Sequence, residues 1–188
     1  MAHRFAEIAF TPAVRARQTV RGSRAAYARL DEGPPRNDRL GVREREFVAQ
    51  RDGLYLASVG ETGWPYVQFR GGPPGFLRVL DERTLGFADF RGNRQYVTLG
   101  NVSADDRVSL FLMDYASRRR LKLLGRARAV DATEDAGLAA RLAVAGYPAL
   151  VERSVLVRVE AFDWNCSQHI PQRWTRAELA AAGVPPPE

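Results

Sequence analysis

Runs of apolar residues with strand character follow one another through the middle of the chain, separated by short polar turns. The predicted strands cover residues 54–59, 64–70, 76–80, 85–90, 108–115, 119–130 and 154–164. Gly60-Glu61-Thr62-Gly63 separates the first two strands and Asp81-Glu82-Arg83-Thr84 the next two, as expected of β-hairpins. Strands joined mainly by hairpins predict an antiparallel barrel, and therefore a mainly β, α+β fold.

Helical patterns flank the predicted barrel. Residues 1–50 predict an N-terminal helical extension, in which Thr11 and Pro12 have the residue types of an N-cap and a first helical position. Further helices are predicted at 42–51, 93–102 and 133–145. A terminal helix is expected to start at Thr175-Arg176-Ala177-Glu178, because this sequence has the spacing of a capping box.

The chain has no internal repeat and no second set of core-forming runs. Its 188 residues suffice for one domain with a sizeable core. We therefore expect a single domain over 1–188, made of the helical extension over 1–50 and the barrel over 53–175. The proline-rich tail over 185–188 is expected to be frayed.

Composition and charge bear on the kind of ligand. Hydrophobic residues make up 45% of the chain and charged residues 27%, which is ordinary for a soluble globular protein. The formal charge of +6 and the pI of about 10.1 raise the question of nucleic-acid binding. The basic residues, however, are nearly all arginines, and they are spread along the chain among acidic ones. This distribution favours small anionic ligands and argues against nucleic acid as the partner.

Cys166 is the one cysteine, so the chain cannot form an internal disulfide, which fits a reducing cytoplasm. No apolar run approaches the roughly 20 residues that cross a membrane, and the N-terminus lacks the apolar core of a signal peptide. We therefore expect a cytoplasmic protein. Cys166 itself is expected to be a buried structural residue rather than a redox centre.

His3 and His169 are the only histidines, and with one cysteine they do not form a zinc-type ligand set, so no metal site is expected. The chain also lacks a Gly-x-Gly-x-x-Gly fingerprint, a P-loop and a Ser-His-Asp arrangement. His169 is the candidate for proton transfer, because the unperturbed pKa of histidine, about 6.5, suits catalysis near neutrality. A purely structural role for His169 is the alternative.

The stretch from Phe87 to Asn101 predicts the most distinctive local site. Its strand runs into Arg91-Gly92-Asn93-Arg94-Gln95, and a helix is expected to begin at Asn93. A helix N-terminus has free backbone N–H groups and a favourable dipole end for an anion, and arginine adds planar donors suited to phosphate. This corner therefore predicts a phosphate site, with a solvated arginine-rich turn as the alternative.

Residues 53–130, followed by Trp164-Asn165-Cys166, resemble the pyridoxamine 5′-phosphate oxidase-like flavoproteins. The resemblance extends over about residues 40–175, and the N-terminal helices are similar to the extension of an uncharacterised branch of that family. It implies an antiparallel FMN-binding split β-barrel with flanking helices. It also implies a homodimer that holds FMN in clefts at the subunit interface.

The resemblance assigns cofactor contacts position by position. Pro65 to Gly71 corresponds to the family's strand along the flavin, and Arg94 to its phosphate-binding arginine. Asn93 and Gln95 stand where the family has serine and lysine, so Arg91 is expected to supply the missing positive charge. The implied cofactor-binding residues are Gln68, Phe69, Arg70, Gly71, Ala88, Asp89, Arg91, Asn93, Arg94, Gln95, Arg120 and Trp164.

For Arg120 and Trp164, a second interpretation of the residue's role stays open. Arg120 falls where the family has a glutamine that touches the cofactor across the dimer, and pairing with an acid across the dimer is the alternative. Trp164 matches a C-terminal tryptophan near the flavin, and simple closure of the core is the alternative.

Two departures separate this chain from the oxidases themselves. Pro73 stands about where they carry a substrate-binding lysine, and their C-terminal Arg-x-His motif is absent. The resemblance therefore implies an FMN-dependent oxidoreductase that acts on an unknown small molecule or a reduced nicotinamide. The alternatives are a non-catalytic flavin- or cofactor-binding protein for storage or sensing, a deazaflavin in place of FMN, and arginine-driven nucleic-acid binding.

Overall fold

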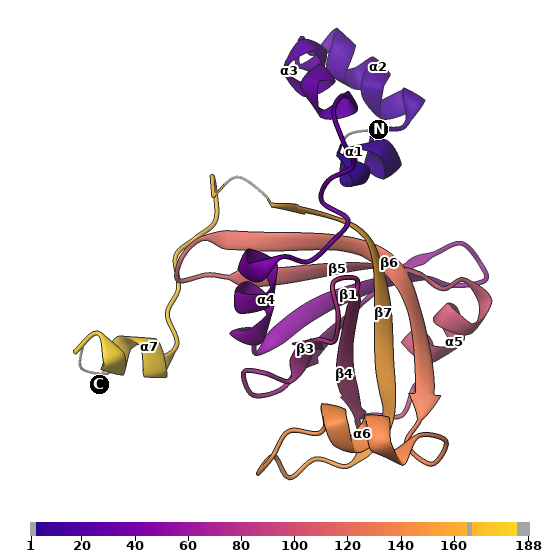
Figure 1. Ribbon diagram of the computed structural model, residues 1–188, viewed down its shortest axis with the longest axis vertical. Coiled ribbons are helices and arrows are strands. Elements are labelled where there is room, and N and C mark those ends of the chain that lie inside the picture. The colour runs from indigo at the N-terminus through magenta and orange to yellow at the C-terminus, as the bar shows by residue number, and fades with distance from the viewer. Residues whose placement is uncertain (1–2, 165–166, 184–188) are drawn as a thin grey trace.

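The computed structural model describes residues 3–164 and 167–183 of the chain. Asn165, Cys166 and the tail over 185–188 lie outside these ranges, so the expectations of a buried cysteine and a frayed tail stay predictions. Within the described residues, seven strands form one antiparallel sheet in the order β2-β1-β5-β6-β7-β4-β3 (Figure 1). The strands are β1 Gly53–Val59, β2 Pro65–Gly71, β3 Leu77–Val79, β4 Thr84–Phe90, β5 Arg107–Asp114, β6 Arg119–Asp131 and β7 Val151–Trp164.

All seven predicted strands are present, and the predicted antiparallel split barrel is confirmed. Most strand ends lie within one residue of the predicted ones, and β3 and β7 show the clearest differences. The third strand, β3, covers only Leu77–Val79 within the predicted range 76–80. The last strand, β7, begins at Val151, before the predicted start at residue 154, because its first residues pair with the end of β4.

The core lies on the inner face of the curled sheet. Alternate residues of the strands point inward, so that β1 and β3 to β7 all contribute to one buried cluster. Fully buried members from five of these strands are Leu56, Leu110, Leu123, Val157 and Phe87. Because one face of the sheet buries these side chains, the register of each strand is fixed by the period-two pattern that the sequence displays.

The two longest strands bend where they pair. The register between β6 and β7 shifts at Leu124/Gly125, which is a β-bulge. A Cβ atom at Gly125 would lie 2.5 Å from the carbonyl oxygen of Arg158, so only glycine allows the backbones to approach this closely. The bulge lets β6 and β7 curve around the core.

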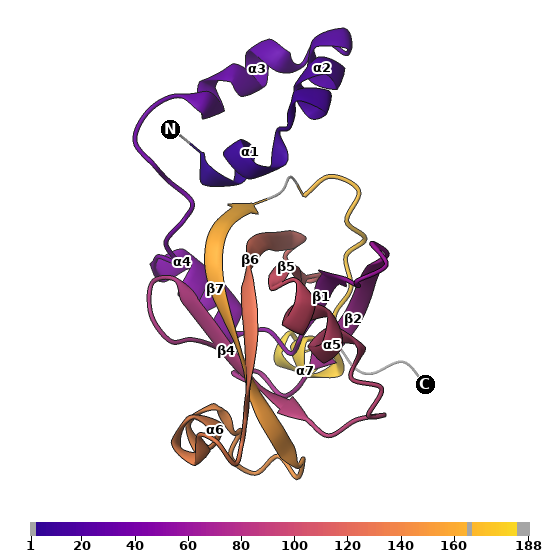
Figure 2. The ribbon, with the colours of Figure 1, turned by 90° about the vertical axis from the view of Figure 1, so that its right-hand side faces the viewer.

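Helices surround the sheet. They are α1 Arg4–Ala9, α2 Pro12–Val20, α3 Arg24–Ala28, the 3-10 turn η1 Arg29–Asp31, α4 Val42–Ala49, α5 Val97–Ala104, α6 Ala136–Leu142 and α7 Arg176–Ala181. Figures 1 and 2 show α1, α2 and α3 grouped beyond one end of β6 and β7, with α6 at the opposite end of the barrel. Helices α1 to α3 of the expected extension over 1–50 are therefore placed beyond one end of the sheet, whereas its last helix, α4, packs against the barrel with Phe47 and Val48 in the core.

The predicted caps of two helices are confirmed. The Thr11 hydroxyl accepts a hydrogen bond from the N–H of Val14, with Pro12 at the first position of α2. Thr175 and Glu178 form the reciprocal capping box of α7, in which the N–H of Glu178 donates to the Thr175 hydroxyl at 3.2 Å and the N–H of Thr175 to the Glu178 carboxylate at 2.7 Å.

The predicted start of α5 at Asn93 is wrong. The helix begins at Val97, and residues 91–96 form a loop between β4 and α5. Arg94 and Tyr96 have φ angles of 60° and 54°, and this left-handed backbone is incompatible with a right-handed helix. Similarly, α6 covers Ala136–Leu142 rather than 133–145, since the Asp135 carboxylate caps the N–H of Leu138.

The helices α1 to α3 are held together and to the barrel by polar contacts. The Asp31 carboxylate accepts two hydrogen bonds from Arg15, at 3.0 and 3.1 Å, and also pairs with Arg24. At the barrel side, Nε2 of His3 lies 3.6 Å from a carboxylate oxygen of Asp163 on β7. The helical unit is thus tied to the end of β7 by a buried histidine.

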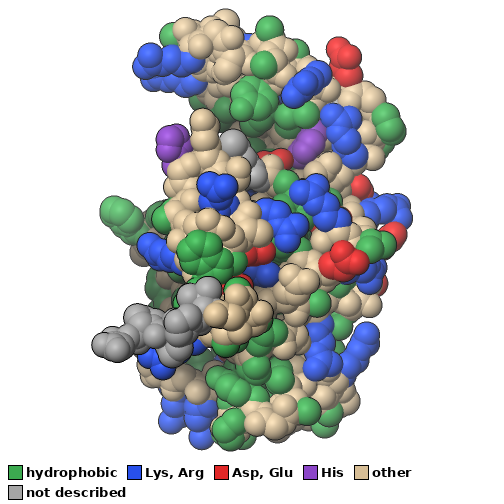
Figure 3. Space-filling model, turned by 90° about the vertical axis from the view of Figure 1, so that its left-hand side faces the viewer, with side chains coloured by type: hydrophobic (Ala, Val, Ile, Leu, Met, Phe, Trp, Pro, Cys, Tyr) green, Lys and Arg blue, Asp and Glu red, His purple; other side chains and the backbone are tan. Residues whose placement is uncertain are grey.

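Basic side chains do not gather into one continuous surface on the face shown in Figure 3, where they alternate with acidic, apolar and uncharged ones. Across the described residues, no group of three or more His, Cys, Asp or Glu side chains is arranged to hold a metal ion. Within the same residues, no helix combines the length and apolarity needed to span a membrane.

Candidate functional site

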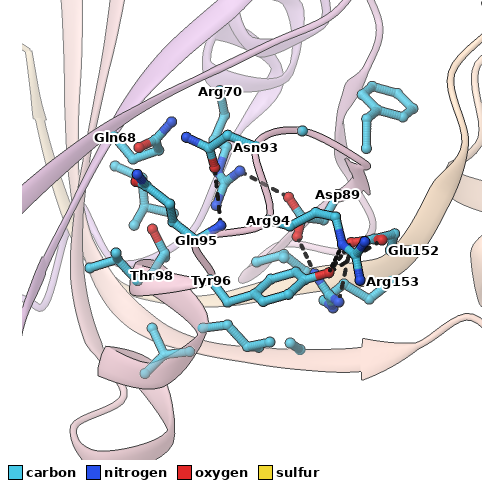
Figure 4. A pocket seen from close by; sticks show the side chains of 18 of the residues that line it. Gln68, Arg70, Asp89, Asn93, Arg94, Gln95, Tyr96, Thr98, Glu152 and Arg153 are labelled. Carbon is cyan, nitrogen blue, oxygen red and sulfur yellow. Dashed lines mark hydrogen bonds and ion pairs between the residues drawn. The ribbon is translucent and has the colours of Figure 1, made fainter.

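A pocket lies at the corner where β2, the end of β4, the loop over 91–96 and the start of α5 meet β6 and β7; we call it the corner pocket. Six of the predicted cofactor-binding residues line it, namely Gln68, Arg70, Asp89, Asn93, Arg94 and Gln95 (Figure 4). Tyr66, Tyr96, Thr98, Glu152 and Arg153 line it as well and were not predicted. The residues come from segments that are far apart in the sequence.

Strand β2 supplies one wall of the corner pocket. Because side chains alternate along a strand, Tyr66, Gln68 and Arg70 face the pocket together. The Tyr66 hydroxyl donates a hydrogen bond to the Gln68 carbonyl oxygen, which fixes the side-chain amide. Phe69 points the other way and packs against Tyr55 with ring centroids 5.5 Å apart.

Asp89, at the end of β4, is held between two arginines. One of its carboxylate oxygens lies 3.0 Å from Arg70, and the other accepts a hydrogen bond from Arg153 at 2.9 Å. Asp89 is only 8% exposed and Arg153 is 9% exposed, so these charges are shielded from water. A shielded carboxylate between two guanidinium groups fixes the position of both arginines.

Arg94 is the cation of the corner pocket that remains available to a ligand. Within the described residues it forms no ion pair, and its one side-chain hydrogen bond runs from Nε to the hydroxyl of Tyr96, at 3.4 Å. A guanidinium group with so few partners retains most of its donors for an anion.

Arg91, the other arginine of the loop, does not line the corner pocket. Its Nε donates a hydrogen bond to the Glu152 carboxylate at 2.9 Å, and this bond is the main cause of a lowered pKa for Glu152. Glu152 also lies 3.4 Å from Arg153. The charge of Arg91 is therefore already matched by an ionised carboxylate.

The loop over 91–96 is conformationally strained. Arg94 and Tyr96 both adopt left-handed φ angles, which cost roughly 1–2 kcal/mol each in residues with a Cβ atom. The Asn93 side-chain oxygen accepts a hydrogen bond from the N–H of Gln95 at 3.2 Å and so braces the turn. Asn37, Arg118 and His169 also have left-handed φ angles but line neither cavity, so among these residues only Arg94 and Tyr96 combine this backbone with a place in a pocket.

Thr98, in the first turn of α5, provides a further polar group. It is 8% exposed, lines the corner pocket, and its hydroxyl has no hydrogen-bond partner in the part of the chain that the structure describes. Buried hydroxyl groups normally have a partner. Figure 4 shows Thr98 on the same side of the corner pocket as Asn93 and Gln95, whereas Arg94 lies on the other side, toward Tyr96 and Glu152.

The other predicted residues lie outside the corner pocket. Gly71 packs under Phe69, since a Cβ atom there would lie 2.8 Å from its ring, and Ala88 is buried beside α6. Arg120 and Trp164 line a second cavity near the N-terminal helices. His169 is exposed at a left-handed turn with φ of 61°, outside the residues that line either cavity.

Trp164 is bound into the junction between α4 and the barrel. Its indole N–H donates to the Glu44 carboxylate at 2.8 Å, and its ring packs edge-on against Phe47 at 4.8 Å. The guanidinium carbon of Arg43 lies over the Trp164 ring, 4.2 Å from its centroid. Within this chain these contacts favour the role that the sequence left as the alternative, closure of the core.

The enclosed part of the corner pocket is small. Its volume is about 60 Å³, whereas sites for small organic ligands typically measure about 300–1,000 Å³. This space suits a phosphate group. A larger ligand would have to extend beyond the enclosed part.

The pocket residues that were not predicted differ in whether the sequence gives a signal for them. Tyr66 precedes Gln68 by two positions, so strand alternation alone would have placed it in the same wall. Glu152 and Arg153 stand at the start of β7, about sixty residues after the loop, and reach it only because β7 pairs with β4. Their participation is a consequence of sheet order, to which the local sequence gives no clue.

Solved structures share this fold. A putative pyridoxamine 5′-phosphate oxidase from Lactobacillus delbrueckii is similar at 21% identity and a TM-score of 0.51, with 67% of this chain and 94% of that one covered. HupZ from Group A Streptococcus matches at 12% identity and a TM-score of 0.51, with 71% and 98% covered. A conserved hypothetical protein from Mycobacterium tuberculosis matches at 16% identity and 0.51, with 76% and 97% covered.

A comparison with family models shows to which protein family the chain belongs. A comparison with curated proteins found no match. The family model described as pyridoxamine 5′-phosphate oxidase matches residues 43–164, which is more than half of the chain and includes nearly all of α4 and the whole sheet. The chain therefore belongs to the pyridoxamine 5′-phosphate oxidase family.

Proposed function

We propose that this protein binds FMN with its phosphate in the corner pocket and acts as an FMN-dependent oxidoreductase. The observation that carries the proposal is Arg94, whose guanidinium group lines the pocket without an ion pair to any described residue. The unpartnered hydroxyl of Thr98 and the amides of Asn93 and Gln95 add donors around the same space. A phosphate of charge near −2 would pair with the Arg94 guanidinium group.

The flavin ring would lie along β2, where Gln68 and Arg70 both face the corner pocket. Bound FMN supplies the hydride and electron chemistry, while the protein contributes position, electrostatics and access. Asp89 holds Arg70 at 3.0 Å and thereby fixes its guanidinium group beside the proposed ring position, where the N–H groups that Asp89 does not use would donate to the ring. The amide of Gln68, held by Tyr66, would orient the ring.

A homodimer would complete the site. The enclosed volume of about 60 Å³ in one protomer is too small for a whole flavin. The outer face of β1 and β2 exposes contiguous apolar side chains, including Tyr55, Val67 at 60% and Phe69 at 55% exposure. Contiguous exposed apolar surface marks interaction sites, and family membership favours a second copy of this chain as its occupant.

The remaining predicted contacts belong to this dimer proposal. Arg120 and Trp164 would approach the flavin only from a partner subunit, as would Phe69 on the outer face of β2. We keep a small organic molecule or a reduced nicotinamide as the substrate, and a cytoplasmic location, as parts of the proposal. His169 stays a prediction for proton transfer.

The first experiment is a visible absorption spectrum of the purified protein, with any released cofactor identified by mass. A yellow protein that releases FMN supports the proposal, and release of a deazaflavin would replace FMN while keeping the flavin class. A colourless protein that does not take up added FMN contradicts it. Steady oxidation of a reduced nicotinamide by the loaded protein would support catalysis, whereas tight FMN binding without turnover of any reductant would favour storage or sensing.

A further inference from the structure

A second cavity separates the N-terminal helices from the barrel; we call it the helical-cap cavity. Its volume is about 420 Å³, which is within the range of about 300–1,000 Å³ typical of sites for small organic molecules. Residues of α1 and α2, including Phe5, Ala6 and Gln18, form one side, and residues of β6 and β7, including Lys122 and Asp163, form the other. The lining residues of the two cavities do not overlap.

Aromatic rings form much of the wall of the helical-cap cavity. Phe10 and Tyr27, from the end of α1 and from α3, meet edge to face with centroids 5.5 Å apart. Phe5 and Trp164 line other parts of the cavity. Walls of this kind favour a flat apolar body, because aromatic rings stack on or against other rings with favourable geometry.

The charged groups of the cavity are mostly matched with one another. Lys122 lies 3.0 Å from Asp163 and also sits over the ring of Phe5, at 4.5 Å. His3 lies 3.6 Å from Asp163, and burial lowers the pKa of its imidazole, so that it is neutral near pH 7. These groups leave no net charge on this side of the cavity.

Arg120 is the charged residue of the helical-cap cavity that has no counter-charge among the described residues. Within the described residues its guanidinium group has no ion pair and no hydrogen bond. Its Cζ atom lies 5.9 Å from the centroid of the Phe111 ring. Its Nε is buried without a hydrogen-bond partner. An arginine that lines a partly enclosed cavity and lacks a counter-charge attracts an anionic group with planar acceptor geometry.

We propose that the helical-cap cavity binds a small aromatic anion, with its ring among the aromatic side chains and its carboxylate or sulfonate group on Arg120. The proposal gives the N-terminal helices a role, since α1 to α3 supply half of the wall and the cavity does not exist without them. The corner pocket is lined by other residues, so the two sites are tested separately. Contact of Arg120 and Trp164 with a flavin across the proposed dimer is the competing role for these two residues, and competition with FMN distinguishes the two roles.

The probe for this site is 8-anilino-1-naphthalenesulfonate, a fluorescent aromatic anion, and its neutral counterpart is N-phenyl-1-naphthylamine. Both are titrated against the full chain carrying Trp64→Phe and Trp174→Phe, two exposed positions, so that Trp164 is the remaining tryptophan. Saturable binding with one site per chain and quenching of Trp164 are expected. Absence of quenching at saturating probe would overturn the proposal.

Two variants on β6 test the contact to the anionic group. Arg120→Gln should weaken binding of the sulfonate probe about tenfold, the loss typical of a charge-assisted contact, while leaving the neutral probe unaffected. Arg128→Gln is the matched control, because Arg128 is an exposed arginine of the same strand that lines neither cavity. Equal affinities of the two variants for the sulfonate probe would overturn the role of Arg120.

A third variant and a competition experiment test the location. Gln18→Phe adds a ring at the partly exposed edge of the cavity and should abolish binding of both probes. It also removes the hydrogen bond that Arg24 donates to Gln18 at 2.9 Å, so Gln18→Ala, which removes that bond without adding a ring, is its control and should retain probe binding. Saturating FMN should leave probe binding unchanged. Displacement of the probe by FMN would show one shared site and overturn the proposal of a separate cavity, without bearing on whether the protein binds FMN.

Discussion

Arg70 and Asp89 lie 3.0 Å apart, although their strands, β2 and β4, stand first and sixth in the order of the sheet. The two side chains can meet only because the sheet curls until its ends face each other. The contact therefore marks the closure of the split barrel and, at the same time, one side of the corner pocket. Both residues were predicted for the site, but their contact with each other was not.

Replacing Asp89 should destabilise the closed barrel. In Asp89→Asn, the partly exposed Arg70 loses its carboxylate partner, whereas Arg153 keeps Glu152 at 3.4 Å and Asp131 at 3.5 Å. Loss of these charge-assisted contacts costs roughly 1–3 kcal/mol, and urea denaturation would measure the loss. Asp106→Asn is the control, because the exposed Asp106–Arg126 pair contributes less than about 1 kcal/mol. Equal losses in the two variants would contradict the role given to the Asp89 pair.

Replacing Arg94 should weaken FMN binding without unfolding the protein. Loss of a charge-assisted phosphate contact costs roughly 1.5–3 kcal/mol, which is about one to two decades in affinity. Quenching of flavin fluorescence on titration with protein would measure it for Arg94→Ala. Arg126→Ala, on the exposed surface, should bind FMN as the parent does.

The two arginines of the loop can be told apart by the same titration. Arg91→Ala should reduce FMN affinity less than Arg94→Ala does, because Arg91 already donates to Glu152 and does not line the corner pocket. A larger loss for Arg91→Ala would restore the sequence-based expectation that Arg91 supplies the phosphate charge.

Charges on the outer face of β1 and β2 should separate the proposed dimer. Val67→Glu combined with Phe69→Glu places two carboxylates in an apolar surface, and burying them there without partners is unfavourable. Sedimentation velocity should show a shift from dimer to monomer, with weaker FMN binding. Val20→Glu, on the exposed α2, should leave the dimer intact. A parent chain that is already monomeric would remove the dimer proposal.

Trp164→Phe should lower stability because it removes the hydrogen bond to a carboxylate oxygen of the buried Glu44. An unsatisfied buried acceptor costs about 1–3 kcal/mol, measurable by urea denaturation. Trp174→Phe, at an exposed position, should change stability by less than about 0.5 kcal/mol. Unchanged stability of Trp164→Phe together with weakened FMN binding would instead favour the flavin contact that the resemblance implied.

Asp105 predicts a specific pH dependence. Hydrogen bonds from Arg107 lower the pKa of the Asp105 carboxyl to about 2, from an ordinary value of 3.8. A depressed folded-state pKa means that the ionised form stabilises the fold; the contribution is complete above about pH 4 and is lost as the pH falls towards 2. The stability difference between the parent and Asp105→Asn should therefore be constant from about pH 5 to 7 and shrink below about pH 4. A difference that grows on acidification would contradict this assignment.

The sequence determined the strands and the two helix caps that it predicted. Period-two alternation identifies the strands because each has one face in the core, and Thr11 and Thr175 act through neighbours a few residues away. The same local signals failed at Asn93, since the left-handed backbone of Arg94 and Tyr96 delays the helix to Val97. Nothing in the local residue types signals that conformation.

Only the tertiary structure decided which predicted residues share a site. Sheet order brings Glu152 and Arg153 to the loop and matches Arg91 with Glu152, so that Arg94 is left as the available cation. The same fold places Arg120 and Trp164 in the wall of the helical-cap cavity. Strand alternation and helix caps depend on neighbours in sequence, whereas charge pairing and cavities depend on long-range packing. For this reason the ion pairs of the site and the two cavities could not be predicted from the chain alone.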